Sequence, residues 1–313
     1  MEQRIAIVGL GAIGGWVAAR LALAGHQVSA LVRTASVEPL VLHDPAGASE
    51  ATVRRVTNAD ELGVQHLVII AVKAPSLADA AQAARSLIGR DTLIVPMLNG
   101  VPWWFLGEDS LESVDVGGRI ARSIPLDRTL GCVVHAAIRR DGPDTVRVQR
   151  ADGILLGESA GGSSARVDQL ANLFTQAGIK AESVADIRRA IWYKLWGNMT
   201  INPVSALTLA TADRILASDT RPFLLACMAE AAAIGTRIGC PIEESGEDRL
   251  AVTARLGAFR TSMLQDVEAG RPIELEALLG APREIARRVG VATPNIDALY
   301  GLTRLFAESR GLL

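Results

Sequence analysis

The first half of the chain alternates short apolar runs with segments whose apolar residues recur every three or four positions. Short unbroken apolar runs are typical of buried strands, and the longer recurrence is typical of helices. Strands are predicted at RIAIVGL, HQVSALVR, HLVIIAVKA and DTLIVPML, and helices at GAIGGWVAARLALAG and PSLADAAQAARSLIG. This strand–helix–strand order predicts an α/β domain whose parallel sheet carries helices on both faces.

The pattern changes after about residue 130. The segments GCVVHAAIRRDG and DTVRVQRADGILLGE predict a hairpin, and SARVDQLANLFTQAG predicts a helix. From Asp186 onward the chain is almost wholly of helical pattern, and Asp186 is a residue type that caps helix N-termini. The simplest partition is an α/β domain over residues 1–185 and an all-α domain over residues 186–313.

Composition limits the functions to consider. The 313 residues exceed the usual size of one domain, and the formal net charge of −2 with scattered arginines favours neither nucleic acid nor an acidic membrane surface as a partner. The cysteines and histidines lack the spacing of a metal site or a disulfide framework, so we expect neither. The apolar N-terminus is interrupted by five glycines and by Arg20, so we expect no membrane span and a cytoplasmic protein.

A G-x-G-x-x-G motif, Gly9–Gly14, joins the first predicted strand to the first predicted helix. Its first glycine permits a tight turn, its second lets backbone N–H groups approach a pyrophosphate, and its third lets the helix pack against the strand. The helix N-terminus adds a partial positive charge. The residues predicted to hold a dinucleotide are Gly9, Gly11, Ala12, Ile13 and Gly14. A strand–helix turn without a ligand is the alternative.

Residues at the ends of the later strands refine this prediction. An NAD site usually carries Asp or Glu after the second strand, whereas this chain has Arg33 and no carboxylate before Glu38. A guanidinium binds a 2′-phosphate in bidentate fashion, so NADP(H) is favoured over NAD(H). Lys73 and Asn99 follow two further strands, at the edge where open α/β sheets bind ligands. For each of the three, an ordinary loop position is the alternative.

The segment WYKLWGNMTINPVSA carries Lys194, Asn198 and Asn202 at intervals of four. Steps of four keep side chains on one face of a helix, so an ammonium and two amides would share a face among tryptophans. A ketone that is reduced develops negative charge on oxygen, which an ammonium can stabilise and protonate. The face is therefore either a solvated stripe or a proton donor with substrate-orienting amides.

Five segments together resemble the ketopantoate reductase (2-dehydropantoate 2-reductase) family: GLGAIGG, AVKAP, LNG, WYKLWGNMTINPVSALT and TSMLQDVEAGRPIELEALLG. They occur in family order over almost the whole chain. The resemblance implies a Rossmann-type NADP-binding domain followed by a helical substrate domain. It also implies NADPH-dependent reduction of a small 2-oxo acid, with ketopantoate as the leading substrate and (R)-pantoate, a precursor of coenzyme A, as the product.

The resemblance implies residue roles as well. Lys194 would be the general acid that protonates the 2-oxo oxygen, with Glu274 facing it. Lys73 would lie near the cofactor, and Asn99 near both nicotinamide and substrate. Ser262 would bind the substrate carboxylate. The residues that would line the substrate site are Asn99, Asn198, Asn202 and Ser262.

Two departures from the family pattern concern the substrate. Phe259 stands where members commonly carry an asparagine, three residues before the serine of the SML segment. Trp103 and Trp104 follow the LNG segment, where members usually have small residues. If these rings face the pocket, the substrate is bulkier or more apolar than ketopantoate, because a polar partner for the hydroxyl is missing. Packing inside the protein is the alternative for the tryptophans.

Three functional hypotheses follow. The first is the ketopantoate reductase, and the second is a paralogous reductase of a bulkier or aromatic 2-keto acid or a related carbonyl. The third is a non-catalytic NADPH sensor, which the face around Lys194 disfavours because a sensor needs no proton donor. We expect the reaction to occur in a cleft between the two domains. The C-terminal helices have enough apolar surface for a homodimer, although packing within the chain explains that surface equally well.

Overall fold

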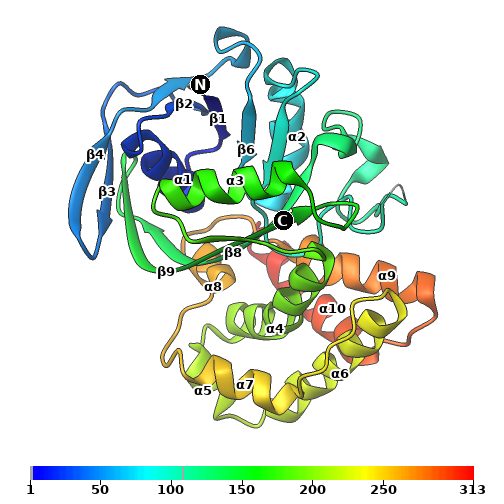
Figure 1. The fold of residues 1–313 in the computed structure, drawn as a ribbon. Coiled ribbons are helices and arrows are strands. Elements are labelled where there is room, and N and C mark those ends of the chain that lie inside the picture. The colour runs from blue at the N-terminus through cyan, green and yellow to red at the C-terminus, as the bar shows by residue number, and fades with distance from the viewer. Residues whose placement is uncertain (1–2, 108) are drawn as a thin grey trace. The chain divides into compact units, whose positions relative to one another are not determined.

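The chain folds into two compact units in a computed structural model that describes residues 3–107 and 109–313 (Figure 1). The first unit contains Met1–Leu98 and Gly118–Arg188, and the second contains Asn99–Gly117 and Arg189–Leu313. The first is α/β and the second is helical, which confirms the predicted fold class. The segment Asn99–Gly117 belongs to the second unit, although the chain before and after it belongs to the first. A single domain boundary at residue 185 does not describe this segment.

A five-stranded parallel sheet with strand order β5-β2-β1-β6-β7 forms one layer of the first unit. Its strands are β1 (Arg4–Val8), β2 (Gln27–Leu31), β5 (Arg54–Val56), β6 (Leu67–Ile70) and β7 (Leu93–Pro96). Every residue of β6 is buried, as expected for a strand covered on both faces. The chain crosses from β1 to β2 through α1 (Ala12–Leu23), and from β6 toward β7 through α2 (Leu77–Ala83), which is shorter than predicted.

A second sheet in the same unit has the order β10-β9-β3-β4, with β8 paired to β9. Its strands are β3 (Leu40–Asp44), β4 (Gly47–Ala51), β8 (Leu130–Arg140), β9 (Thr145–Glu158) and β10 (Ala181–Ser183). The β8–β9 pair confirms the predicted hairpin, and α3 (Ala165–Gln176) confirms the helix after it. Helix α1 contacts both sheets and is buried from Gly14 to Ala19, which explains why this part of the helix is apolar on all sides.

Helices make up most of the second unit, together with the segment Asn99–Gly117. They are α4 (Ile187–Thr208), α5 (Ala212–Leu216), α6 (Arg221–Arg237), α7 (Gly246–Ala254), α8 (Ser262–Glu268), α9 (Ala281–Val289) and α10 (Pro294–Ser309). A π-helical turn, Glu276–Gly280, directly precedes α9. Helix α4 begins at Ile187, immediately after the predicted cap residue.

Two tryptophans fix α4 against α6. The indole N–H of Trp192 donates to the carbonyl of Ala231 at 3.1 Å, and that of Trp196 donates to the carbonyl of Met228 at 2.8 Å. Their spacing of four places both rings on one face of α4. Residues displaced by two positions lie about 200° away around a helix. The packing of the tryptophans therefore turns the face that carries Lys194 away from α6.

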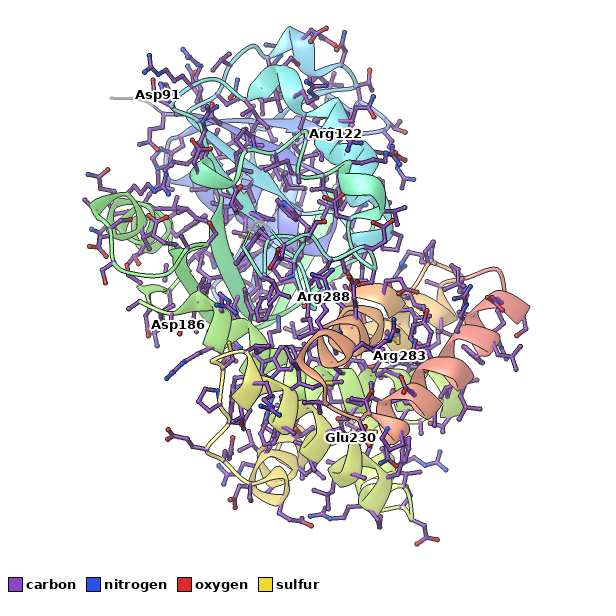
Figure 2. The ribbon with its side chains drawn as sticks, turned by 90° about the vertical axis from the view of Figure 1, so that its right-hand side faces the viewer. Asp91, Arg122, Asp186, Glu230, Arg283 and Arg288 are labelled. Atoms are coloured by element: carbon purple, nitrogen blue, oxygen red, sulfur yellow. The ribbon has the colours of Figure 1, made fainter. Side chains whose placement is uncertain are left out.

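A half-buried acid ties α10 to α6. Glu230 on α6 is labelled in Figure 2, and its carboxylate accepts hydrogen bonds from the backbone N–H groups of Asn295 and Ile296, each at 2.9 Å. A carboxylate at a helix N-terminus satisfies orphan N–H groups and stabilises the helix dipole. This contact holds the first turn of α10 in place.

Candidate active site

The glycine turn after β1 requires glycine at two positions. Gly9 has φ +92°, and a Cβ atom there would lie 2.7 Å from Cγ1 of Val72. A Cβ atom at Gly14 would collide with the carbonyl oxygen of Gly9. The turn is therefore shaped by the absence of side chains, as the G-x-G-x-x-G motif predicts.

Gly11 presents the open end of α1. It is the N-cap of α1 and makes no side-chain capping bond, and the first turn carries no acid. A Cβ atom at Gly11 would meet only the carbonyl oxygen of Ala71, at 3.8 Å. The first N–H groups of a helix lack partners within the helix and attract anions. These residues fit the pyrophosphate of a pyridine dinucleotide, because Gly9, Gly11 and Gly14 have no side chain that could block the approach to those N–H groups.

Two cations follow the strands on either side of this turn. The N–H of Gly9 donates to the carbonyl of Leu31 at 3.0 Å, and the exposed Arg33 stands two residues after Leu31. On the β6 side, Val72 lies against Gly9, and Lys73 comes directly after it. Both cations therefore gather at the carboxyl edge of the sheet, where open α/β sheets bind ligands.

In the second unit, hydrogen bonds join Lys194, Asn99 and Glu274. The Nζ of Lys194 donates to Oδ1 of Asn99 at 3.0 Å, and Nδ2 of Asn99 donates to Oε2 of Glu274 at 3.4 Å. Glu274 is only 5% exposed, while Lys194 and Asn99 are half-buried. The structure thus brings together three predicted site residues, with the amide of Asn99 between the ammonium and the carboxylate.

The loop that carries Asn99 is held by its backbone. The N–H of Val101 donates to the carbonyl of Ala277 at 2.9 Å, so the loop is bonded to the π-helical turn. Gly100 has φ +80°, and a Cβ atom there would collide with that same carbonyl oxygen. Glycine therefore permits both the conformation and the close approach. The attachment joins segments far apart in the chain and has no local signal in the sequence.

The other predicted substrate residues lie on α4 and α8. Asn198 is half-buried and Asn202 is 6% exposed, on the α4 face of Lys194. Ser262 is the first residue of α8, whose N-cap Thr261 accepts a hydrogen bond from the N–H of Leu264 at 3.1 Å. Among the residues that the structure describes, hydrogen bonds do not link these three to Asn99 or Lys194. Their roles stay predictions.

The aromatic residues after Asn99 are interior residues of the second unit. Trp103 and Trp104 are 3% and 2% exposed, and Phe105 stacks on Trp192 with ring centroids 5.8 Å apart. The structure therefore supports packing inside the protein, and not a place in the substrate pocket, for Trp103 and Trp104. Phe259, in contrast, is half-buried, three residues before the start of α8.

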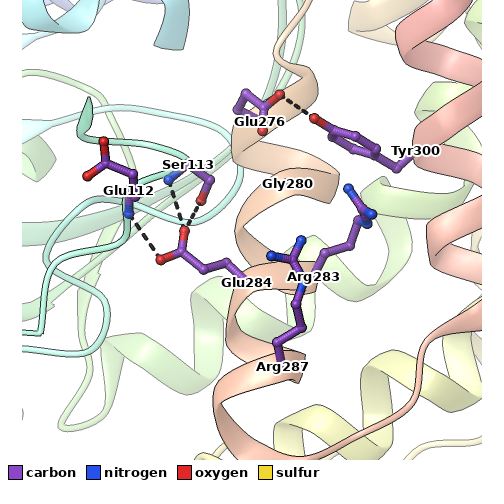
Figure 3. Close-up of a pocket in the computed structure, with 8 residues that line it drawn as sticks. All are labelled: Glu112, Ser113, Glu276, Gly280, Arg283, Glu284, Arg287 and Tyr300. Carbon is purple, nitrogen blue, oxygen red and sulfur yellow. Dashed lines mark hydrogen bonds between the residues drawn. The ribbon is translucent and has the colours of Figure 1, made fainter. Parts of the chain in front are cut away.

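A polar cavity of about 340 Å³ lies elsewhere in the second unit (Figure 3). It is lined by Glu112, Ser113, Glu276, Gly280, Arg283, Glu284, Arg287 and Tyr300. Its polar groups largely bind one another: Tyr300 donates to Glu276 at 2.8 Å, and the Arg283 guanidinium stacks on the Tyr300 ring at 4.0 Å. Burial and the bond to Glu276 raise the pKa of Tyr300. Lys194, Asn99 and Glu274 do not line this cavity, so it is distinct from their cluster.

Comparison with known proteins identifies the family. The family model described as ketopantoate reductase PanE/ApbA matches residues 5–161, and the model of its C-terminal domain matches residues 186–307. The chain belongs to the ketopantoate reductase family. It is therefore an oxidoreductase of a family that uses pyridine nucleotides, and it acts on a small molecule. The resemblance inferred from the sequence motifs is confirmed.

Several relatives of this ketopantoate reductase family member match along their whole length. A 2-dehydropantoate 2-reductase from Mesorhizobium japonicum is 41% identical, with 99% of each chain covered. A crystal structure from Ralstonia solanacearum, described as a candidate ketopantoate reductase, is 50% identical, with a TM-score of 0.96 over 100% of both chains. The 2-dehydropantoate 2-reductase from Methylococcus capsulatus is 29% identical, with a TM-score of 0.86 over 98% and 97% of the chains. Within the described ranges, none of the helices is both long enough and apolar enough to cross a membrane.

Proposed function

We propose that the protein catalyses the NADPH-dependent reduction of 2-dehydropantoate (ketopantoate) to (R)-pantoate. The relative from Mesorhizobium japonicum is named 2-dehydropantoate 2-reductase and covers 99% of the chain, which supports 2-dehydropantoate as the substrate. The observation that carries the chemistry is the hydrogen-bonded chain from Lys194 through Asn99 to Glu274. It places an ammonium and a buried carboxylate on either side of one amide, an arrangement suited to proton donation.

In this proposal Lys194 is the general acid. NADPH, when bound, supplies a hydride to the carbonyl carbon of the 2-oxo acid. Negative charge then develops on the carbonyl oxygen, and the Lys194 ammonium stabilises this charge and transfers a proton to it. An ammonium has three N–H donors, so its bond to Asn99 is compatible with a second bond to the substrate oxygen. The reaction leaves a 2-hydroxy acid and a neutral lysine.

Asn99 and Glu274 would orient and stabilise the donor. Because Oδ1 of Asn99 accepts from Lys194 and Nδ2 donates to Glu274, the amide has one orientation that satisfies both neighbours. The negative charge of Glu274 favours the protonated form of Lys194 while substrate binds. Substrate contacts would come from Asn198 and Asn202, and Ser262 would bind the carboxylate.

The cofactor would lie on the first unit. The turn Gly9–Gly14 would hold the pyrophosphate, Arg33 the 2′-phosphate that distinguishes NADPH from NADH, and Lys73 a further anionic group of the cofactor. The partition at residue 185, a homodimer and a cytoplasmic location stay predictions.

A panel of 2-oxo acids tests this function. We expect ketopantoate to give the highest kcat/KM when NADPH oxidation is followed by absorbance, and Lys194→Ala protein, purified identically, to be the control for contaminating reductases. If no 2-oxo acid in the panel is reduced, the proposed function is wrong.

Phe259 favours a second candidate, a reductase of an aromatic 2-oxo acid. The ring is half-buried and stands three residues before Ser262, the residue predicted to bind the carboxylate. A marked preference for phenylpyruvate over ketopantoate in the panel would establish this alternative. With ketopantoate as substrate, Phe259→Asn should raise kcat/KM roughly tenfold by supplying a hydrogen-bond partner for the hydroxyl. Phe259→Leu, which supplies none, is the matched control.

A further inference from the structure

The attachment of the Asn99 loop depends on an unpaired carbonyl in a helix. Carbonyl groups inside an α-helix accept the N–H four residues later, and those in a π turn accept the N–H five residues later. The carbonyl of Ala277 would therefore accept from residue 281 or residue 282. It accepts instead from Val101, at 2.9 Å.

Both helical donors to Ala277 are missing, for different reasons. The N–H of Ala281 donates to the carbonyl of Glu276, five residues back, as part of the π-helical turn. The next residue is Pro282, which has no N–H. The carbonyl of Ala277 is thus left to a partner from outside the helix, and the N–H of Val101 fills that place.

Pro282 also favours the π turn itself. A proline inside a helix clashes with the carbonyl four residues back, here that of Leu278, and so opposes the regular α register. If the α register returned, Ala281 would donate to Ala277 and would displace Val101. The proline therefore both creates and protects the acceptor to which the loop binds.

This attachment sets the position of Asn99. Asn99 and Val101 flank Gly100, whose close approach to Ala277 leaves the loop little freedom. Glu274 lies three residues before Ala277, at the start of the same helical segment, and its backbone carbonyl accepts from Leu278 at 3.1 Å. One backbone contact thus fixes Asn99 relative to Glu274.

We propose that Pro282 is a positioning residue: by reserving the Ala277 carbonyl for Val101, it holds Asn99 where its amide bridges Lys194 and Glu274. The inference rests on the proposed function of Lys194 and Asn99. Pro282 acts through the backbone and not on the substrate.

The far end of the segment Asn99–Gly117 is bound to α9 by separate hydrogen bonds. Loss of the bond between Val101 and Ala277 should therefore not release the whole segment. Glu284 accepts from the N–H groups of Glu112 at 3.1 Å and Ser113 at 2.9 Å (Figure 3). Arg288, also on α9 and labelled in Figure 2, donates to the carbonyl of Ser110 at 2.6 Å. A change at residue 282 should therefore shift Asn99 locally while the segment stays on the helical unit.

The test is Pro282→Ala in the full-length protein. The new N–H can bond to Leu278 and restore the α register, which frees the Asn99 loop. We expect kcat to fall between about tenfold and a hundredfold, as for a misplaced catalytic group, with the KM for NADPH unchanged. Pro294→Ala is the matched control: Pro294 is exposed at the start of α10, where an N–H has no helical partner, and its kcat should be unchanged.

A double-mutant cycle with Asn99→Ala separates positioning from a merely structural role. If Pro282 acts through Asn99, Pro282→Ala lowers kcat no further once Asn99 is alanine. An equal further fall in that background, or full kcat in the single variant, overturns the inference. If the Pro282→Ala protein does not fold, Gly100→Ala replaces it in the double-mutant cycle, because the added Cβ atom would collide with the Ala277 carbonyl and displace the loop. Lys194→Ala distinguishes failure of the proposed function from failure of the inference about Pro282, because an active Lys194→Ala protein contradicts only the proposed function.

Discussion

The glycine turn of the first unit and the Lys194 cluster of the second are built in opposite ways. The turn occupies six consecutive residues, Gly9–Gly14, and is shaped by backbone conformation and missing side chains. The cluster joins side chains separated by 95 positions, from Asn99 to Lys194, and by 175 positions, from Asn99 to Glu274. Function of the glycine turn should therefore be lost when atoms are added to it. Function of the Lys194 cluster should be lost when side-chain atoms, or the contacts that position them, are removed.

The largest expected effect comes from removing the ammonium of the cluster. Lys194→Ala should lower kcat by about 100-fold or more, because general acid catalysis is lost, while the Kd for NADPH stays within about twofold. Steady-state kinetics and a fluorescence titration with NADPH measure the two quantities. Lys180→Ala is the control, since Lys180 lies in an exposed pair with Glu182 in the first unit and should affect neither. Unchanged turnover in Lys194→Ala would remove this residue from the mechanism.

Adding one methyl group to the turn should weaken NADPH binding, whereas removing the Lys194 ammonium lowers kcat and leaves NADPH binding nearly unchanged. At Gly11 a Cβ atom has room within the protein but would stand where the pyrophosphate approaches. Gly11→Ala should therefore weaken NADPH binding by roughly tenfold to a hundredfold, with the melting temperature nearly unchanged. Gly14→Ala should instead lower the melting temperature, because its Cβ collides with the carbonyl of Gly9. Normal NADPH affinity in Gly11→Ala would mean that the turn does not hold the pyrophosphate.

A smaller effect is expected at Arg33, where the turn meets the adenosine end of the cofactor. Arg33→Ala should weaken NADPH binding roughly tenfold, the loss of a charge-assisted contact with a phosphate, and should leave NADH binding nearly unchanged. Parallel titrations with the two nucleotides give the ratio. Arg54→Ala, an exposed arginine of β5 paired with Glu61, is the control. Equal losses for NADPH and NADH would assign Arg33 to general charge attraction and not to the 2′-phosphate.

The contrast between the two sites explains what could be predicted from sequence. The turn and the strand after it are local, so a motif and its context sufficed for the first unit. The face of Lys194 was predictable too, because helical periodicity is local and the tryptophans mark the opposite side. The attachment of Val101 to Ala277 was not predictable, since it depends on two segments far apart in sequence and on a π turn that periodicity does not signal.

Other differences have the same origin. The β3–β4 hairpin lies in a region without a predicted strand, because most of β4 is exposed and its residues Gly47–Ala51 carry no alternating apolar pattern. Trp103 and Trp104 gave no local indication of whether they lined a pocket or the interior, and only their tertiary contacts place them in the core. Pro282 was visible within a helical pattern, yet its consequence depends on the distant N–H of Val101.

The smallest expected effect concerns the anchor at Glu284, which supports the cluster at a distance. Burial would raise the pKa of Glu284, but the hydrogen bonds from Ser113, from the backbone N–H groups and from Arg288 together lower it below its ordinary value of 4.5. A carboxyl group whose pKa is lowered in the folded state stabilises the protein above its unfolded pKa, and this stabilisation is lost as the pH falls through the folded value.

Glu284→Gln should therefore lower the free energy of unfolding of the helical unit by about 1 kcal/mol at pH 7, with kcat nearly unchanged because Val101 still holds the Asn99 loop. The difference from the wild type should shrink below about pH 4.5, the ordinary carboxyl value, as the native carboxylate becomes protonated. Urea unfolding at neutral and acid pH measures it, with Glu308→Gln, from an exposed pair with Arg304 on α10, as a control expected within about 0.5 kcal/mol of the wild type. A fall in kcat as large as that of Pro282→Ala would show that the two ends of the segment are not independent, and that the position of Asn99 depends on the whole of Asn99–Gly117.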